Sequence, residues 1–555
     1  MSRARILLDA ALLIFVAILV ACYAAALNEI FYARFGPFYD SMAYLNESAR
    51  MMGVTAQEGF FAAVRLSTSA ATVFLPFAEA AVLGSFLQPS RWLGVLIQLP
   101  WLIVYVLSGY CYFRRVSKLP SVTAICFAIS LISFAAMFFA NGGLSDFRMD
   151  LLQALTFGAS IATYLVARER PSPMHWIGLG TLLGASCLCR ATTPVYIVMV
   201  FAPFAVADVL DVRRRKLASG LLLAAFAAIV VSGWFFVLNF GRLYHYYIVW
   251  NPDANAHLPL RDSYRHINFV RDGVGWPIGL TLLLSMAANV ALNSGRLASL
   301  NWRALWAGLA PLAYLVLSGA GLNPFVSMVA IPGIMLFALA PFTPSEGHAG
   351  GGQFHNHLVA GAALMASALS LSGGIANHKY TVSEWVPRNK AMREVNRLIM
   401  ENAESPDQRA LTLTAAYSGA LDATAIANSL IFDEGFKVDR HWCLSRNAIK
   451  LSPVRLGLSS QTEWNAFAGA SDQEKIASLA QQILSSADFI VLVDDSTPPI
   501  AHPHTPVNRY TKELGNIILS HDGIRPLGAP ISISPIEKVN IYRNQTRLPN
   551  VGGAC

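Results

Sequence analysis

Runs of about 20 mostly apolar residues recur along the first 376 residues of the chain, and each is long enough to cross a bilayer as a helix. A membrane-spanning helix satisfies its own backbone polar groups, so a helical bundle is the fold open to such a chain. The composition agrees, because 55% of the residues are hydrophobic and 13% are charged. Soluble domains carry roughly 25% charged residues. We therefore expect an integral membrane protein.

About eleven spans are predicted. They are Ile6–Leu27, Trp92–Phe113, Pro120–Ala140, Leu151–Ala167, His175–Cys189, Thr192–Leu210, Ala218–Phe240, Trp276–Asn293, Ala304–Ala320, Phe325–Phe342 and Leu358–Ala376. The segment Ala70–Leu87 is apolar too, but Pro76 and Glu79 interrupt it, so we do not count it as a span. The run His175–Cys189 is short and is expected to form a hairpin with the next run, with Arg190 at its tip.

Basic residues indicate the orientation. Clusters beside the spans fall on one side of the membrane: Arg3 and Arg5, Arg114 to Lys118, Arg168 and Arg170, and Arg213 to Lys216. The positive-inside rule makes that side cytoplasmic, and an odd number of spans places the C-terminal part outside. The same clusters explain the net charge of +8, so nucleic-acid binding is not expected. The N-terminus also imitates a signal peptide, but its apolar run is long, so we expect an uncleaved first span.

The first outside loop places Asp40 in the apolar-aromatic segment FYARFGPFYDSMAY. A helical stripe follows, opposite the polar residues Asn46, Glu47 and Arg50; it consists of Phe38, Met42, Leu45, Ala49 and Met52. Such a helix is expected to lie in the membrane interface. Asp40 would stand at its N-terminus, either as a helix cap or as a functional carboxylate at the water boundary.

The second informative loop is a short outside turn, NGGLSDFRMD, which contains Asp146, Arg148 and Asp150. Two aspartates and an arginine in so short a turn can build a compact charge network or hold a divalent cation. The plain alternative is a polar turn whose aspartate caps the next helix. Charged residues at membrane depth are functional candidates by default, which favours a functional turn.

These features together resemble the GT-C superfamily of polytopic glycosyltransferases, which includes the protein-mannosyl and aminoarabinose transferases. Four features carry the resemblance: Asp40, the GGLSDFRMD turn, the segment Gly178 to Pro194 followed by a span and RRRK, and a soluble domain after the last span. It covers roughly Met1 to Ala376. The resemblance implies an α-helical polytopic GT-C-like domain over residues 1–376 in a bacterial inner membrane, and inverting transfer from a polyprenyl-phosphate sugar.

By this resemblance Asp40 is the base or orienting group at the acceptor. Many relatives have an adjacent acidic pair, whereas Ser41 follows Asp40 here, so Asp40 would act alone or with Asp146 or Asp150. The departing phosphate needs cationic groups or a divalent metal ion. Candidates are Arg190, Arg148 and the loop from Gly241 to Gly275, which contains Tyr246, Tyr247, His257, Arg261, Arg265 and His266. Interfacial aromatic residues and snorkelling arginines are the plain alternatives for that loop.

Residues 377–555 have the composition of a soluble, extracytoplasmic α/β domain. Ser471 and Glu474 form a predicted capping box before a helix, and a strand follows at Phe489–Val493. Cys443 and Cys555 lie in this exported part, where a disulfide is permitted. We interpret the domain as an acceptor-side or structural module.

The sequence therefore predicts a glycosyltransferase that uses a polyprenyl-phosphate sugar and a glycan, lipid or protein acceptor outside the cytoplasm. The leading rival is a transporter or flippase of a lipid-linked sugar, which would need charged residues along a path through the bundle. A noncatalytic envelope-assembly protein is the third alternative. The identity of the sugar and the need for a metal stay open.

Overall fold

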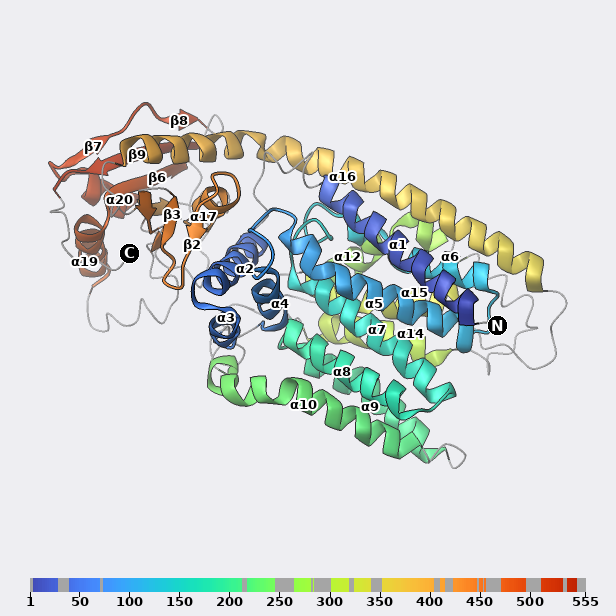
Figure 1. Cartoon of the computed structure of the whole chain (residues 1–555). Coiled ribbons are helices and arrows are strands. Elements are labelled where there is room, and N and C mark those ends of the chain that lie inside the picture. The colour runs from blue at the N-terminus through green and yellow to red at the C-terminus, as the bar shows by residue number, and fades with distance from the viewer. Residues whose placement is uncertain are drawn as a thin grey trace. The chain divides into compact units, whose positions relative to one another are not determined.

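The computed structural model forms two compact units, which we describe separately. Unit 1 comprises residues 1–28, 68–76 and 94–379, and unit 2 comprises residues 29–67, 77–93 and 380–555. The structure describes residues 3–27, 39–69, 73–211, 217–244, 264–280, 283, 301–318, 324–340, 352–403, 410–414, 423–446, 449–452, 454–455, 471–495, 511–532 and 537–546. Figure 1 shows the helices and strands along the chain.

Unit 1 is a helical bundle. Five of its described helices are long and apolar enough to cross a membrane: α1 (Arg3–Leu27), α5 (Leu93–Arg115), α7 (Met149–Glu169), α9 (Thr193–Leu210) and α10 (Leu217–Tyr244). Shorter described helices of this unit are α6 (Ser121–Leu131), α8 (Pro173–Cys189), α12 (Tyr264–Val274), α14 (Trp302–Leu317) and α15 (Ile331–Leu339). The polytopic helical fold is confirmed, whereas the exact count of eleven spans is not.

Two predicted spans are broken helices. The run Pro120–Ala140 forms α6, leaves the helix at Ile132 and continues as the 3₁₀ turn η2 (Ala135–Phe138). The run Phe325–Phe342 starts as the 3₁₀ helix η7 (Pro324–Ala330) before α15. Hydropathy alone missed both breaks, because apolar residues fill the turn as well as the helix. The predicted span Trp276–Asn293 lies mostly outside the described residues.

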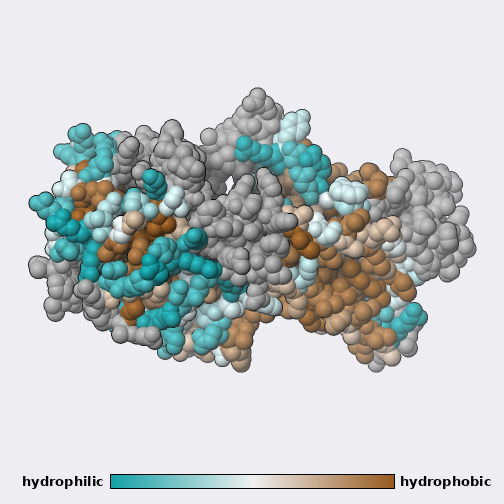
Figure 2. Space-filling model, turned by 90° about the horizontal axis from the view of Figure 1, so that it is seen from above, coloured by the Kyte–Doolittle hydropathy of each residue, from teal (hydrophilic) through white to brown (hydrophobic). Residues whose placement is uncertain are grey.

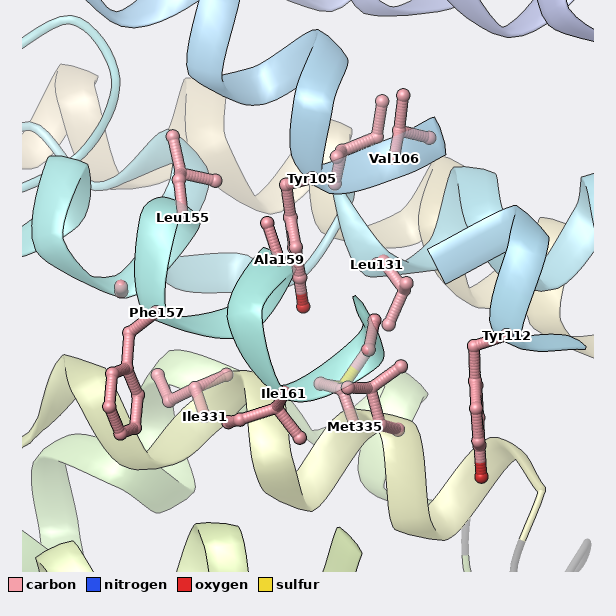
Figure 3. Packing of buried hydrophobic residues seen from close by; sticks show 14 of the residues in the cluster. Tyr105, Val106, Tyr112, Leu131, Leu155, Phe157, Ala159, Ile161, Ile331 and Met335 are labelled. Atoms are coloured by element: carbon pink, nitrogen blue, oxygen red, sulfur yellow. The ribbon is translucent and has the colours of Figure 1, made fainter. Parts of the chain in front are cut away.

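Helix α7 is the centre of unit 1 and is buried along nearly its whole length. Figure 3 shows its residues Leu155, Ala159 and Ile161 among side chains of neighbouring helices, including Tyr105 of α5 and Met335 of α15. Helix α10, which packs on α8, instead exposes large apolar side chains: Leu222, Phe226, Ile229, Val237 and Leu238. Figure 2 shows a broad apolar surface of this kind on the bundle. A contiguous exposed apolar surface on a helical bundle is typical of contact with lipid.

Helix α16 (Gly352–Asn402) has 51 residues. It includes the predicted span Leu358–Ala376 and continues without a break through Asn377, where the composition changes to that of a soluble domain. The predicted non-span Ala70–Leu87 yields only the nine-residue helix α4 (Leu75–Leu83) in its described part, which is too short to cross a bilayer.

Unit 2 contains the predicted α/β fold. Its larger sheet has the strand order β5-β1-β6-β9-β7, and β8 also pairs with β9. Strand β1 (Ala410–Thr414) is parallel to β5 (Val454–Arg455) and to β6 (Phe489–Asp495). Strand β9 (Glu537–Asn544) runs antiparallel to β6, β7 (Ile524–Pro526) and β8 (Ile531–Ser532). A smaller antiparallel sheet consists of β2 (Lys437–Val438), β3 (Leu444–Arg446) and β4 (Ile449–Leu451).

The helices that the structure describes after β1 are α17 (Ala423–Phe432), α19 (Asp472–Ser486) and α20 (Thr511–Leu519), and the C-terminal part of α16 (Gly352–Asn402) packs in the same core as α17. The predicted capping box is confirmed, because Ser471 and Glu474 exchange side-chain to backbone hydrogen bonds at the start of α19. The predicted strand Phe489–Val493 is confirmed as part of β6. Cys443 is disulfide-bonded, whereas Cys555 lies outside the described residues.

The loop predicted to be the first outside loop also belongs to unit 2, through α2 (Tyr39–Glu58), α3 (Phe60–Ser67) and most of α4. The expectation that the apolar stripe of α2 lies in the membrane interface is wrong. Met42 and Ala49 are buried in the same hydrophobic core as Ile426, Leu430 and Val438 of the C-terminal domain. A stripe at helical spacing indicates a buried face, but it does not reveal whether lipid or protein covers that face.

Candidate active site

Asp40 is the second residue of α2, in its first turn, where the helix macrodipole favours a carboxylate. The prediction that it stands at a helix N-terminus is confirmed, although it lies inside the helix rather than at the capping position before it. Seven residues on, Glu47 pairs with Arg50 at 3.0 Å. Burial raises the pKa of Glu47, and the charge of Arg50 and its hydrogen bond partly oppose that rise.

The turn between η2 and α7 is a compact, buried charge network, which is one of the alternatives that the sequence left open. The Asp146 carboxylate is fully buried and accepts hydrogen bonds from the Gly142 backbone N–H at 2.6 Å and from Arg148 Nε at 3.3 Å. Gly142 has a φ of 88°, a backbone conformation that glycine adopts without strain. The Asp146 carboxylate therefore links Gly142, near the start of the turn, to Arg148 at its end.

Arg148 has a second contact that the sequence did not reveal. Its guanidinium group lies 4.4 Å from the centre of the Phe325 ring, a cation–π geometry. Phe325 also meets Phe269 of α12, with ring centres 5.2 Å apart. Because α12 carries Arg265 and His266, the aromatic contacts connect part of the large predicted loop to the turn. Arg265 is exposed, whereas His266 is buried.

Arg190 stands at the tip of the hairpin between α8 and α9, as predicted, and forms an ion pair with Asp150 in the first turn of α7. Asp150 is nearly buried, but 21% of the Arg190 side chain is exposed. The hairpin tip is fixed by Thr193, whose hydroxyl donates to the Arg190 carbonyl at 2.7 Å and accepts from Gln153 Nε2 at 2.8 Å. The contacts of Arg190 thus fix its position, and its side chain stays partly exposed.

Two amide side chains hold the turn and were missed in the sequence. Gln98 of α5 donates to the Leu144 carbonyl at 3.2 Å, and Asn377 of α16 accepts from the Ala140 backbone N–H at 2.9 Å. Gln98 could have been found in the sequence, because it is a lone amide within an apolar span. Polar residues in spans usually form hydrogen bonds to other protein groups. Asn377 offered no such signal, since it stands where the composition becomes polar.

A second buried ionic cluster lies at the other end of α7 and was also missed. Asp208 is fully buried and accepts from Tyr164 Oη at 2.5 Å, Arg168 Nε at 2.9 Å and Arg303 Nη2 at 2.6 Å. Arg168 and Asp150 are 18 residues apart on one helix, which is about 27 Å. No charged residue lies between them on α7.

The turn fits a charge network better than a divalent cation. Asp146 is engaged by Arg148, and Asp150 by Arg190, so arginines already supply the neutralising charge. The described residues contain no group of three or more His, Cys, Asp or Glu that could hold a metal ion.

The remaining predicted site residues are not all described. Tyr246, Tyr247, His257 and Arg261 lie outside the described residues. Of the described candidates, Asp40 belongs to unit 2, and the two arginine–aspartate pairs belong to unit 1. The structure brings Asp146 together with Arg148, and Asp150 together with Arg190.

No family model matches the sequence, and neither does any curated protein. Solved structures match by fold. ArnT from Cupriavidus metallidurans, bound to undecaprenyl phosphate, aligns over 94% of this chain and 97% of its own, with 11% identity and a TM-score of 0.57. ArnT has the GT-C fold, so the expected fold class is confirmed. An oligosaccharyltransferase from Archaeoglobus fulgidus, in complex with Zn and sulfate, aligns over 86% of this chain and 67% of its own, with 12% identity and a TM-score of 0.44.

Proposed function

We propose that the chain is a GT-C-type glycosyltransferase of the bacterial inner membrane, with its N-terminus in the cytoplasm and its C-terminal domain outside. It transfers a sugar from a polyprenyl-phosphate donor to an extracytoplasmic glycan, lipid or protein acceptor, with inversion at the anomeric carbon. The observation that carries the proposal is the fold, shared with ArnT over 94% of the chain, whose solved structure contains undecaprenyl phosphate.

Asp40 is the general base in this reaction. Its carboxylate takes the proton of the acceptor hydroxyl while the hydroxyl oxygen bonds to the anomeric carbon. The bond between that carbon and the phosphate oxygen breaks at the same time, and the polyprenyl phosphate leaves with the electron pair. A positioned cation stabilises the charge that develops on this phosphate. Inversion follows because the acceptor enters opposite the leaving group.

Arg190 is the best candidate for the phosphate among the described arginines of the two pairs. Asp150 orients it, and 21% of its side chain is open to a ligand. Only 7% of the Arg148 side chain is exposed, and it is already engaged by Asp146 and the Phe325 ring. Arg148 therefore suits a structural role in the turn.

The distribution of charge favours transfer over transport. A transporter of a charged, lipid-linked sugar needs polar groups along a path through the membrane. The central helix α7 has ion pairs near its two ends and no charged residue over the 17 positions between Asp150 and Arg168. That pattern supports chemistry at one membrane surface.

The test is transfer by purified protein in lipid from a panel of radiolabelled polyprenyl-phosphate sugars, with and without chelator. We expect Asp40→Asn to lower the transfer rate on the order of 100-fold or more, since it removes the base. Asp472→Asn, at an exposed aspartate of α19, is the matched control and should transfer normally. Loss of transfer on chelation would establish a metal requirement.

Two outcomes would contradict the proposal. A folded wild type that transfers none of the sugars would favour the transporter, and a flipping assay in the same vesicles would then decide. Full transfer by Asp40→Asn would remove Asp40 from the role of base.

A further inference from the structure

The helix that carries Asp40 is bonded to the C-terminal domain along its polar face. Asn46 is almost fully buried; its amide donates to the Thr424 carbonyl and accepts from Asn428 Nδ2, both at 2.9 Å. One turn further, Arg50 donates through Nε and Nη2 to the Arg440 carbonyl. The Arg50 guanidinium group also lies 5.3 Å from the centre of the Trp442 ring. The bonds of Asn46 are directional, so they define the rotation of α2 on α17.

The next turn of α2 touches the backbone of the domain. A Cβ atom built on Gly53 would lie 2.0 Å from the Val438 carbonyl oxygen, so any side chain here would push α2 away from β2. Asn46, Arg50 and Gly53 are spaced by four and three residues and share one face of the helix. Met42 and Ala49, four residues before and three residues after Asn46, adjoin them on the same side of the helix and are buried in the core of the domain. One broad side of α2 is therefore packed and hydrogen-bonded to the domain.

The segment after α4 provides a further tether within unit 2. Arg91 pairs with Asp433 at the end of α17, at 2.6 Å. Both stretches of the first outside loop, residues 29–67 and 77–93, are therefore structural parts of the C-terminal unit.

We propose that the C-terminal domain positions Asp40 for catalysis, with Asn46, Arg50 and Gly53 as positioning residues that act through the orientation of α2. This inference rests on the proposed function, in which Asp40 is the base. Asn46 is six residues from Asp40 on the same helix, about 9 Å along its axis. A change in the way α2 docks on the domain would therefore also displace Asp40. Misplacement by about 1 Å can lower a rate on the order of 100-fold.

The experiment compares Arg50→Ala with Arg446→Ala in the full chain in lipid. Arg446 forms a surface pair with Glu434 in the same domain and contacts no α2 residue through it, so its variant controls for loss of an arginine. We expect Arg50→Ala to lower kcat on the order of 100-fold with the KM for the donor unchanged. Arg50→Lys, which keeps one donor for the Arg440 carbonyl, should recover part of kcat.

Hydrogen–deuterium exchange tests the docking itself, independently of activity. In Arg50→Ala the amides of α2 should lose protection while those of α19 and β6 keep theirs, which shows that the domain is still folded. Gly53→Ala should behave in the same way. Its control is Gly178→Ala, at a helical glycine of unit 1 where a Cβ would meet nothing within 4 Å.

The outcomes separate the two proposals. A wild type that transfers no sugar overturns the proposed function and the positioning role with it, while the exchange data still decide whether α2 is docked. Unchanged protection of α2 in both variants overturns the docking. Lost protection with wild-type kcat overturns the positioning role and leaves the proposed function intact.

Discussion

Replacing Asp208 by alanine should destabilise the protein by about 3–5 kcal/mol, because it removes one partner of a buried charge cluster. The fully buried carboxylate accepts from Tyr164, Arg168 and Arg303. Arg168 keeps a second partner in Glu169 at 2.7 Å, so the main cost comes from Arg303, which loses its carboxylate at a mostly buried position. Tyr164→Phe removes a single hydrogen bond to a charged acceptor and should cost about 1.5–3 kcal/mol.

The double variant Asp208→Ala/Arg303→Leu distinguishes this reasoning from a general loss of packing. A buried ion pair is worth little over apolar residues of similar size, so removing both charges should restore much of the stability. The assay is equilibrium unfolding of the purified protein in mixed micelles, followed by tryptophan fluorescence. A cost of less than about 1 kcal/mol for Asp208→Ala would refute the argument, because that is an ordinary effect of substitution. A double variant no more stable than Asp208→Ala would refute it as well.

Two further predictions concern the turn and the C-terminal domain. Gly142→Ala would place a Cβ 2.6 Å from the Phe325 ring at a φ of 88°, so it should lower both the thermal midpoint and the transfer rate; Gly361→Ala, with open space around it, should change neither. The backbone N–H and hydroxyl of Ser471 hold the pKa of Glu474 below its ordinary value of 4.5. Its stabilisation is therefore complete above that pH and is lost as the pH falls through the lower folded value, and Glu474→Gln should flatten this acid dependence of the thermal midpoint.

Local patterns predicted the elements well. The spans around Asp150 and Arg190 follow from apolar length, and the capping box at Ser471 follows from residues three apart. The pairing of Asp146 with Arg148 was also within reach, since both lie in one short turn. Each of these depends on neighbours in the sequence.

The rest depends on contacts between distant segments. Phe325 lies 177 positions after Arg148, and a phenylalanine in an apolar run looks the same whether it packs on lipid, on a helix or under a guanidinium group. The apolar stripe of α2 led to a wrong prediction for the same reason. Periodicity indicates that one face of the helix is buried, but it does not show whether lipid or protein buries it. The break at Ile132 was hidden because hydropathy is blind to backbone dihedrals.

The division of unit 2 between two distant stretches of chain has a consequence for synthesis. Asn46 and Asn428 are separated by 382 residues. A ribosome adding 5–20 residues per second needs about 20–80 s to make that interval. On our proposal, the phosphate-binding Arg190 is synthesised during this delay, while α2 still lacks the domain on which it packs. Synthesis of the C-terminal domain would then complete the active site. A truncated chain without this domain would therefore not transfer the lipid-linked sugar.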